Sequence, residues 1–117
     1  MKVPADSYFA GLVDGEGCIG IHCRGAGRNK RLSLRVNMAH RQTILAIYNR
    51  FKVGSICRRL PLNPNHKTQW VWKCVCNDAL NVLVILRPHL ITKANIVDKL
   101  IAEWSRMKHT KGPDRNA

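Results

Sequence analysis

Acidic residues are scarce in this sequence. Only 7 Asp and Glu oppose 20 Lys and Arg, so the formal net charge of the 117 residues is +13. A charge this far from zero exceeds what solubility requires, and it attracts polyanions over long distances. The composition therefore predicts a polyanionic partner, with nucleic acid as the leading candidate, and gives no sign of a small-molecule substrate.

Long apolar runs are also missing. No stretch approaches the roughly 20 apolar residues that cross a bilayer, and no basic amphipathic helix stands apart from the core pattern. The start, Met-Lys-Val-Pro, lacks the apolar segment of a signal peptide. We therefore expect no membrane partner and an intracellular location, in which a bacterial or phage-infected cytoplasm and an organelle are both open.

The five cysteines lack the spacing of a metal site. They are Cys18, Cys23, Cys57, Cys74 and Cys76, with no C-x-x-C pair among them. This spacing argues against a structural zinc site. We expect reduced, mostly buried thiols in an intracellular protein.

The length predicts one domain, over 1–108, followed by a polar and disordered tail over 109–117. One such domain is short for an enzyme that must embrace a large substrate. Symmetric self-association would double its reach.

Hydrophobic periodicity predicts an α+β fold. Residues 31–38 alternate aliphatic with polar side chains, which is the period of a half-buried strand. Helices are expected over 4–14, 44–51, 78–87 and 93–107, with Asn77 or Asp78 as a cap, and strands over 19–24, 31–38, 55–60 and 67–76. The order α-β-β-α-β-β-α-α places the helices on one face of a curved antiparallel four-stranded sheet.

The other face of that sheet is rich in hydrogen-bond donors. If the aliphatic residues bury, and Trp70 and Trp72 with them, the outward set is His22, Arg24, Arg31, Ser33, Arg35, Asn37, Arg59, Gln69 and Lys73. In a DNA major groove, Arg reads guanine and Asn or Gln reads adenine. Phosphate contacts are expected from Arg28, Lys30, Lys67 and Lys108. The alternative is an ordinary solvated sheet face.

The run Phe9-Ala-Gly-Leu-Val-Asp-Gly-Glu-Gly-Cys18 ends an apolar helix on acidic residues and then begins a strand. Gly15 and Gly17 would allow positive φ, so that the chain turns sharply and holds Glu16 at the helix end. Ala10 and Gly11 would allow close approach of a second copy of this helix. An ordinary glycine-terminated helix with two exposed acids is the alternative.

This run resembles the signature of the LAGLIDADG homing endonucleases. The resemblance extends over residues 8–104 and includes Pro88-His-Leu-Ile-Thr-Lys93, which is similar to a segment before the family's last helix. It implies Glu16 as the metal-binding carboxylate, aided by the Gly15 carbonyl. Mg²⁺ suits these oxygen ligands, and Mn²⁺ or Ca²⁺ could occupy the same site.

The resemblance also implies further site residues. Lys93 takes the place of an active-site lysine, although it could instead be a first-turn surface lysine. His40 either organises the attacking water or caps the next helix. Ile44 stands where some relatives carry a basic residue, for which Arg41 could substitute. Two copies, joined through Ala10, Gly11 and Asp14, would bring two Glu16 carboxylates together; Asp14 is expected to satisfy backbone or interface groups rather than metal.

The leading hypothesis is a homodimeric, Mg²⁺-dependent endonuclease, of the kind encoded in mobile introns, that cuts both strands of a long pseudo-palindromic double-stranded DNA site. A cleavage-inactive LAGLIDADG protein, acting as an intron maturase or a DNA- or RNA-binding regulator, is the alternative. A small ribosomal or RNA-binding protein is disfavoured, because the three Trp lie in apolar patterns rather than at stacking positions.

Overall fold

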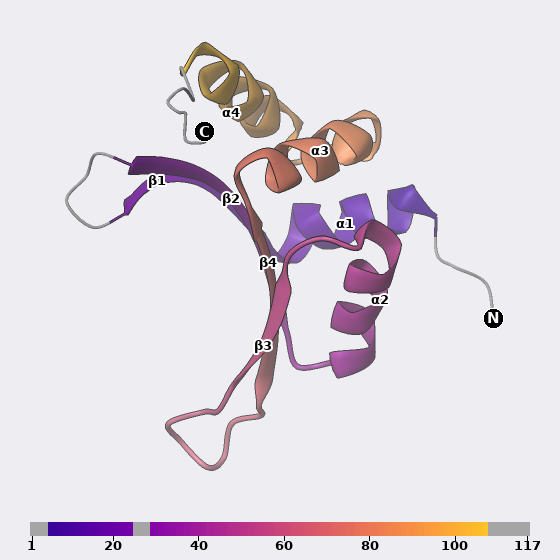
Figure 1. The fold of residues 1–117 in the computed structure, drawn as a ribbon. Coiled ribbons are helices and arrows are strands. Elements are labelled where there is room, and N and C mark those ends of the chain that lie inside the picture. Colours follow the sequence, from indigo (N-terminus) through magenta and orange to yellow (C-terminus); the bar gives the residue numbers. More distant parts are fainter. Residues whose placement is uncertain (1–4, 25–28, 108–117) are drawn as a thin grey trace.

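The helices gather on one side of a four-stranded antiparallel sheet (Figure 1). This computed structural model describes residues 5–24 and 29–107. The elements are α1 (Asp6–Glu16), β1 (Gly17–Arg24), β2 (Asn29–Met38), α2 (Arg41–Phe51), β3 (Ser55–Arg59), β4 (Gln69–Val75), α3 (Cys76–Leu86), a 3-10 turn η1 (Arg87–His89) and α4 (Ala94–Arg106). The predicted α+β class and element order are confirmed.

The strands run in the order β1-β2-β4-β3, and every neighbouring pair is antiparallel. The central strand β2 buries Leu32, Leu34 and Val36 completely, as its alternation predicts. These side chains meet Phe9 of α1 and residues of all the other helices in one hydrophobic core. Since successive side chains of a strand point to opposite faces, the polar residues between them lie on the face away from the helices.

Strand β4 contributes its tryptophan set to the core. Trp72 is 1% exposed and Cys74 2% exposed, which confirms the predicted orientation. The indole Nε1–H of Trp72 donates to the carbonyl of Val53 at 2.9 Å, so its buried polar group has a partner. Val71, on the opposite face, is also buried, although it lies outside the main core.

The end of α1 differs from the sequence prediction. The helix continues through Gly15 and Glu16 instead of ending at Asp14. Gly17 has φ −81°, and Gly54 is the one glycine of the described ranges with positive φ. A Cβ at Gly17 would lie 2.8 Å from the Val13 carbonyl oxygen. Gly17 therefore serves close packing at the junction of α1 and β1, and the turn needs no left-handed residue.

Helix α3 also begins differently. It starts at Cys76, directly after β4, and no side chain caps it. Cys76 adopts φ +58°, a conformation that is uncommon outside glycine. Asn77, a predicted cap, instead accepts a hydrogen bond from Trp104 Nε1–H at 3.3 Å.

Among the helices of the described ranges, none has the length and apolar character to cross a membrane.

The thiols are less buried than expected. Cys74 is buried and Cys76 half-buried, but Cys18 and Cys57 are exposed. Burial, with a smaller contribution from Asp78, raises the pKa of the Cys74 thiol to about 12. All four are free, and the side chain of Cys23 lies outside the described part of the chain.

Gly54 generates a test of the packing beneath β4. Its φ is +87°, and a Cβ there would lie 2.5 Å from the Lys73 carbonyl oxygen and 3.0 Å from Trp72 Nε1. We expect Gly54→Ala to lower the free energy of unfolding by about 1–3 kcal/mol, measured by urea denaturation. Gly15→Ala is the matched control, since nothing lies within 4 Å of its added methyl group. Equal stability of the two variants would contradict this packing.

Candidate active site and nucleic-acid interface

Glu16 is the last residue of α1, and its side chain is exposed. Within the described residues, no hydrogen bond or ion pair occupies its carboxylate. The preceding residue, Gly15, is exposed as well. A carboxylate and a neighbouring carbonyl are oxygen ligands of the kind that Mg²⁺ and Ca²⁺ take. They are an incomplete set, however, because the described part of one chain holds no group of three or more His, Cys, Asp or Glu able to bind a metal.

Asp14 ties α1 to the start of α4, more than 75 residues further along the chain. Its carboxylate accepts from the backbone N–H of Ile91 at 2.8 Å and from that of Lys93 at 2.9 Å. Partial burial raises the pKa of Asp14, but the backbone N–H groups of Ile91, Lys93 and Thr92 and the charge of Lys93 lower it on balance. The prediction that Asp14 satisfies backbone groups is confirmed.

Lys93 lies next to this contact. Its Nζ donates to the carbonyl oxygen of Asp14 at 2.6 Å, and its backbone is the N-cap of α4. The side chain also lines a hollow of about 520 Å³, whose other residues are Gly17, Cys18, Ile19, His22, Ser33, Arg35 and Lys73. The structure therefore brings Lys93 together with the polar face of the sheet. The hollow begins at Gly17, the residue after Glu16, and continues over β1, β2 and β4.

His40 and Arg41 do not line this hollow. His40 is the N-cap residue of α2, but its side chain makes no capping hydrogen bond to the backbone; its Nδ1 lies 2.7 Å from Thr43 Oγ1. The guanidinium of Arg41 lies 5.2 Å from the centroid of the Trp70 ring. Ile44 is fully buried in the core. Arg41 is thus engaged with an indole ring, and Ile44 serves packing.

The open face of the sheet is the face that the helices do not cover. Strand pairing places Arg35 between Cys18 and Lys73, and pairs Gly20 with Ser33 and His22 with Arg31. It also pairs Asn37 with Val71, and Gln69 with Arg59. The predicted outward residues therefore share this face; the side chains of Arg24 and Arg28, and all of Lys108 and the tail, lie outside the described residues.

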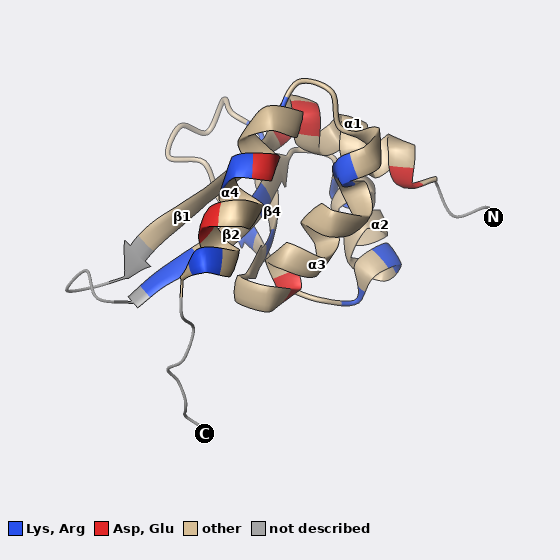
Figure 2. Cartoon of the chain, turned by 90° about the horizontal axis from the view of Figure 1, so that it is seen from above, with Lys and Arg blue, Asp and Glu red and all other residues tan. Residues whose placement is uncertain are grey.

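The acidic residues lie on the helices and not on the strands of the sheet. No Asp or Glu occurs from Gly17 to Asn77, the stretch that contains all four strands. Figure 2 shows the acidic positions in red on helices. Two of them are paired there: Asp6 with Arg50 at 2.8 Å, and Asp98 with Arg87. The basic side chains of the open face have no acidic neighbour on the sheet.

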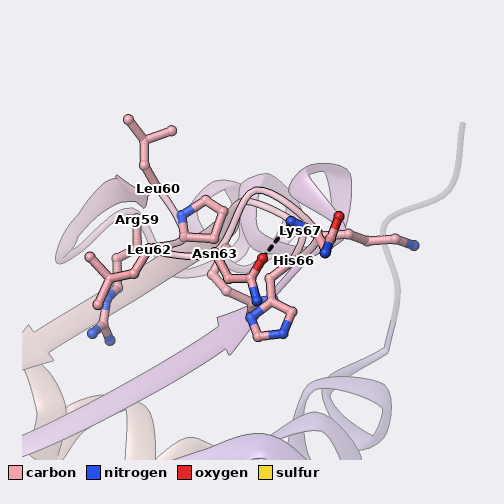
Figure 3. Close-up of a pocket in the computed structure, with 9 residues that line it drawn as sticks. Arg59, Leu60, Leu62, Asn63, His66 and Lys67 are labelled. Atoms are coloured by element: carbon pink, nitrogen blue, oxygen red, sulfur yellow. Dashed lines mark hydrogen bonds between the residues drawn. The ribbon is translucent and has the colours of Figure 1, made fainter.

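The β3–β4 hairpin extends this face beyond the helices (Figure 1). A hollow of about 790 Å³ lies at its tip, drawn in Figure 3, and includes Arg59 and Gln69 of the open face. Leu62 is fully exposed there and Leu60 is 68% exposed. The loop is shaped by Asn63, whose Oδ1 accepts from the backbone N–H of Asn65 at 2.9 Å. The sequence predicts only a connection between the strands over 55–60 and 67–76 here, with Lys67 as a phosphate contact.

The side chain of Asn37 contains an acceptor that is not hydrogen-bonded within the described residues. Its Oδ1 is buried and has no hydrogen-bond partner within the residues that the structure describes. A buried acceptor without a donor is costly. The oxygen of this predicted outward residue therefore lacks a donor in the described chain, and because it is covered it can accept one from a partner only if the side chain turns.

Ala10 does not belong to an exposed interface. It is completely buried in the chain's own core with Phe9 and Val13, so it offers no surface to a second copy. Gly11 is exposed, and a Cβ there would meet nothing within 4 Å. The exposed side of α1 carries Tyr8, Gly11 and Gly15, which follow helical spacing. Of the two small residues, Ala10 thus faces the core and Gly11 faces solvent.

Comparison with known proteins gives matches among solved structures. No family model and no curated protein matches the sequence. The homing endonuclease I-CvuI, in complex with its target in the presence of calcium, is 23% identical with a TM-score of 0.72, over 92% of this chain and 70% of that chain.

Two further structures show the same likeness. The archaeal intron-encoded homing endonuclease I-Vdi141I, complexed with DNA, is 17% identical with a TM-score of 0.61, over 95% of this chain and 89% of that one. The LAGLIDADG meganuclease I-AabMI, bound to uncleaved DNA, is 19% identical with a TM-score of 0.70, over 97% of this chain but 40% of that one. At these identities the likeness concerns the backbone arrangement, and this chain has the fold of the LAGLIDADG homing endonucleases.

Proposed function

We propose that this protein is a LAGLIDADG homing endonuclease that acts as a homodimer and hydrolyses both strands of a long pseudo-palindromic DNA site with a divalent metal. The observation that carries the proposal is the exposed Glu16 carboxylate at the end of α1, one residue before Gly17, which lines a hollow together with Lys93 and the acid-free sheet face. The structural neighbours bound to DNA support the choice of partner.

The open face supplies DNA binding. Arg31, Arg35 and Arg59 would read guanine edges or contact phosphates, and Asn37 and Gln69 would read adenine. His22, Ser33 and Lys73 complete the surface. Counterion release from the phosphates would make binding strongly dependent on salt.

The donor chemistry at the end of α1 fits one side of a divalent metal site. Glu16 and the Gly15 carbonyl would hold Mg²⁺, which would activate water and stabilise the departing oxygen when bound. Lys93 would place a positive charge near the phosphate, where negative charge increases in the transition state. Two copies would be needed, because one chain provides one such carboxylate.

The exposed face of α1 supplies the proposed dimer contact. Gly11 and Gly15 leave the helix backbone accessible, and Tyr8 is 46% exposed beside them. Small residues let two helices approach closely. The 40% coverage of I-AabMI is also in agreement with one copy forming half of a larger assembly.

A cleavage-inactive binding protein is the second candidate. The observation that favours it is the burial of Ile44, which stands where some relatives carry a basic residue, together with the contact of Arg41 with Trp70; neither residue lines the hollow that contains Lys93. Nicking of a plasmid that carries the site, with and without Mg²⁺, separates the two candidates. Metal-dependent cutting supports the nuclease, and tight binding without cutting supports the alternative.

The role of Glu16 gives the first functional prediction. We expect Glu16→Gln to abolish cleavage while specific binding stays within about tenfold, or about 1.4 kcal/mol, because the carboxylate serves the metal rather than the bases. Gel assays of cleavage and binding on the same DNA measure both effects. Glu103→Gln removes an exposed carboxylate from α4 and should leave both unchanged. Metal-dependent cutting by purified Glu16→Gln would remove Glu16 from the mechanism.

The dimer contact is tested at Gly11. We expect Gly11→Leu to weaken self-association at least about tenfold, roughly 1.4 kcal/mol, because the added side chain separates the two helices. Analytical ultracentrifugation across a concentration series measures the shift. Ala102→Leu adds a similar side chain on the exposed side of α4 and is the matched control. A wild-type chain that is monomeric both alone and on DNA would rule out the symmetric site.

Base reading is tested at Arg35. Arg35→Ala should cost about 1–3 kcal/mol on the preferred site and relax discrimination at one position of each half-site. Lys67→Ala, in the hairpin, should weaken binding about equally on all sequences and reduce its salt dependence. Titrations over a randomised half-site library distinguish the two effects. A uniform loss from Arg35→Ala would mean that this side chain contacts phosphate rather than bases.

A further inference from the structure

We propose that Asp14 is a positioning residue that acts through Lys93: it holds the lysine in place from the opposite end of the chain. This inference rests on the proposed nuclease function. It is carried by three hydrogen bonds between Asp14 and the segment from Ile91 to Lys93, with donor–acceptor distances of 2.6–2.9 Å. Two of them use the Asp14 carboxylate, and the third uses its backbone carbonyl.

The Asp14 carboxylate holds the backbone of the segment that leads into α4. The N-cap residue is Lys93, which has no hydroxyl or carboxylate, and no side chain of α4 caps the helix. Asp14 reaches over from α1 and accepts the N–H groups of Ile91 and Lys93. A negative charge is also favourable beside the positive end of the helix dipole. The position of the Lys93 backbone therefore depends on Asp14.

The side chain of Lys93 is held as well. It shares its hollow with Arg35 and Lys73, two groups of the same charge. Repulsion from these cations would favour rotamers that point away from the site. The hydrogen bond from Nζ to the Asp14 carbonyl opposes this, and it leaves two Nζ–H donors for a phosphate oxygen. Asp14 thus holds both the backbone N–H and the side-chain Nζ of Lys93.

A double-mutant cycle tests whether Asp14 acts through Lys93. Single-turnover cleavage is measured for the wild type, Asp14→Asn, Lys93→Met and the double variant, at saturating DNA and Mg²⁺. We expect Lys93→Met to slow cleavage about 100- to 1,000-fold and Asp14→Asn about 10- to 100-fold. In the Lys93→Met background, Asp14→Asn should have no further effect beyond about twofold. Additive losses would overturn the inference, because they would mean that Asp14 acts independently.

Controls separate positioning from folding. DNA affinity in Ca²⁺ should stay within about threefold of the wild type for Asp14→Asn, so that the loss lies in the rate and not in binding. Asp98→Asn removes a different carboxylate from the contact between η1 and α4 and should leave the rate unchanged. If Asp14→Asn does not fold by circular dichroism, the cycle is repeated with Asp14→Glu, which keeps the charge but displaces it by one methylene; the same non-additivity is expected.

A readout without cleavage keeps this inference distinct from the proposed function. Acetylation of lysines by an amine-reactive ester, followed by mass spectrometry, compares Lys93 with Lys99, an exposed lysine of the same helix. Lys93 should react more slowly than Lys99 in the wild type, and Asp14→Asn should reduce the difference. A protected Lys93 in a protein that cuts no DNA would overturn the nuclease proposal alone. Equal reactivity of the two lysines in the wild type would overturn the role of Asp14.

Discussion

Helix α1 has to serve two surfaces at once, and the rest of the structure depends on this division. One side buries Phe9, Ala10 and Val13 in the core, where they anchor the helix to the sheet and α3. The other side carries Gly11 and Gly15 into solvent. Since the helix ends at Glu16, packing of the inner side fixes where the outer side presents its carboxylate. The position of the candidate active site is therefore set by ordinary core packing.

The strands are under an electrostatic constraint. The basic side chains of the sheet repel one another because the strands contain no carboxylates, and the acidic residues of the helices do not neutralise the open face. Two acids of the helices are engaged elsewhere: Arg50 lowers the pKa of Asp6, mainly through a side-chain hydrogen bond, and Arg87 does the same for Asp98. These pairs hold α1 to α2 and η1 to α4. The charge of the open face is thus left for a partner, and a polyanion would relieve the repulsion.

The sequence was most informative where local pattern and global packing agree. The alternation of Leu32, Leu34 and Val36 with arginines predicted both the orientation of β2 and the members of the open face. The tryptophan set of β4 was oriented correctly because an unpaired buried Lys73 would be costly. Strand register follows from these patterns, since a slip of one residue would exchange the two faces.

Prediction failed where a residue's environment is set by distant contacts. Ala10 and Gly11 are adjacent and both small, yet one is buried and the other open, because adjacent helical positions lie about 100° apart around the axis. The need for Gly17 comes from the Val13 carbonyl and not from a left-handed turn. No local signal could have indicated that Asp14 accepts hydrogen bonds from Ile91 and Lys93, which lie almost 80 residues away.

In a dimer joined through α1, folding and association would be linked. Glu16 and the exposed glycines belong to one helix, so any contact that holds two copies of α1 together also sets the separation of their two carboxylates. Lys93 is tied to the same helix by Asp14, and α4 begins at that tie. Helix α4 is in turn anchored by Val97 and Trp104 in the core. A change in the packing of α4 would therefore move the lysine relative to the carboxylate, although α4 itself lies apart from the open face.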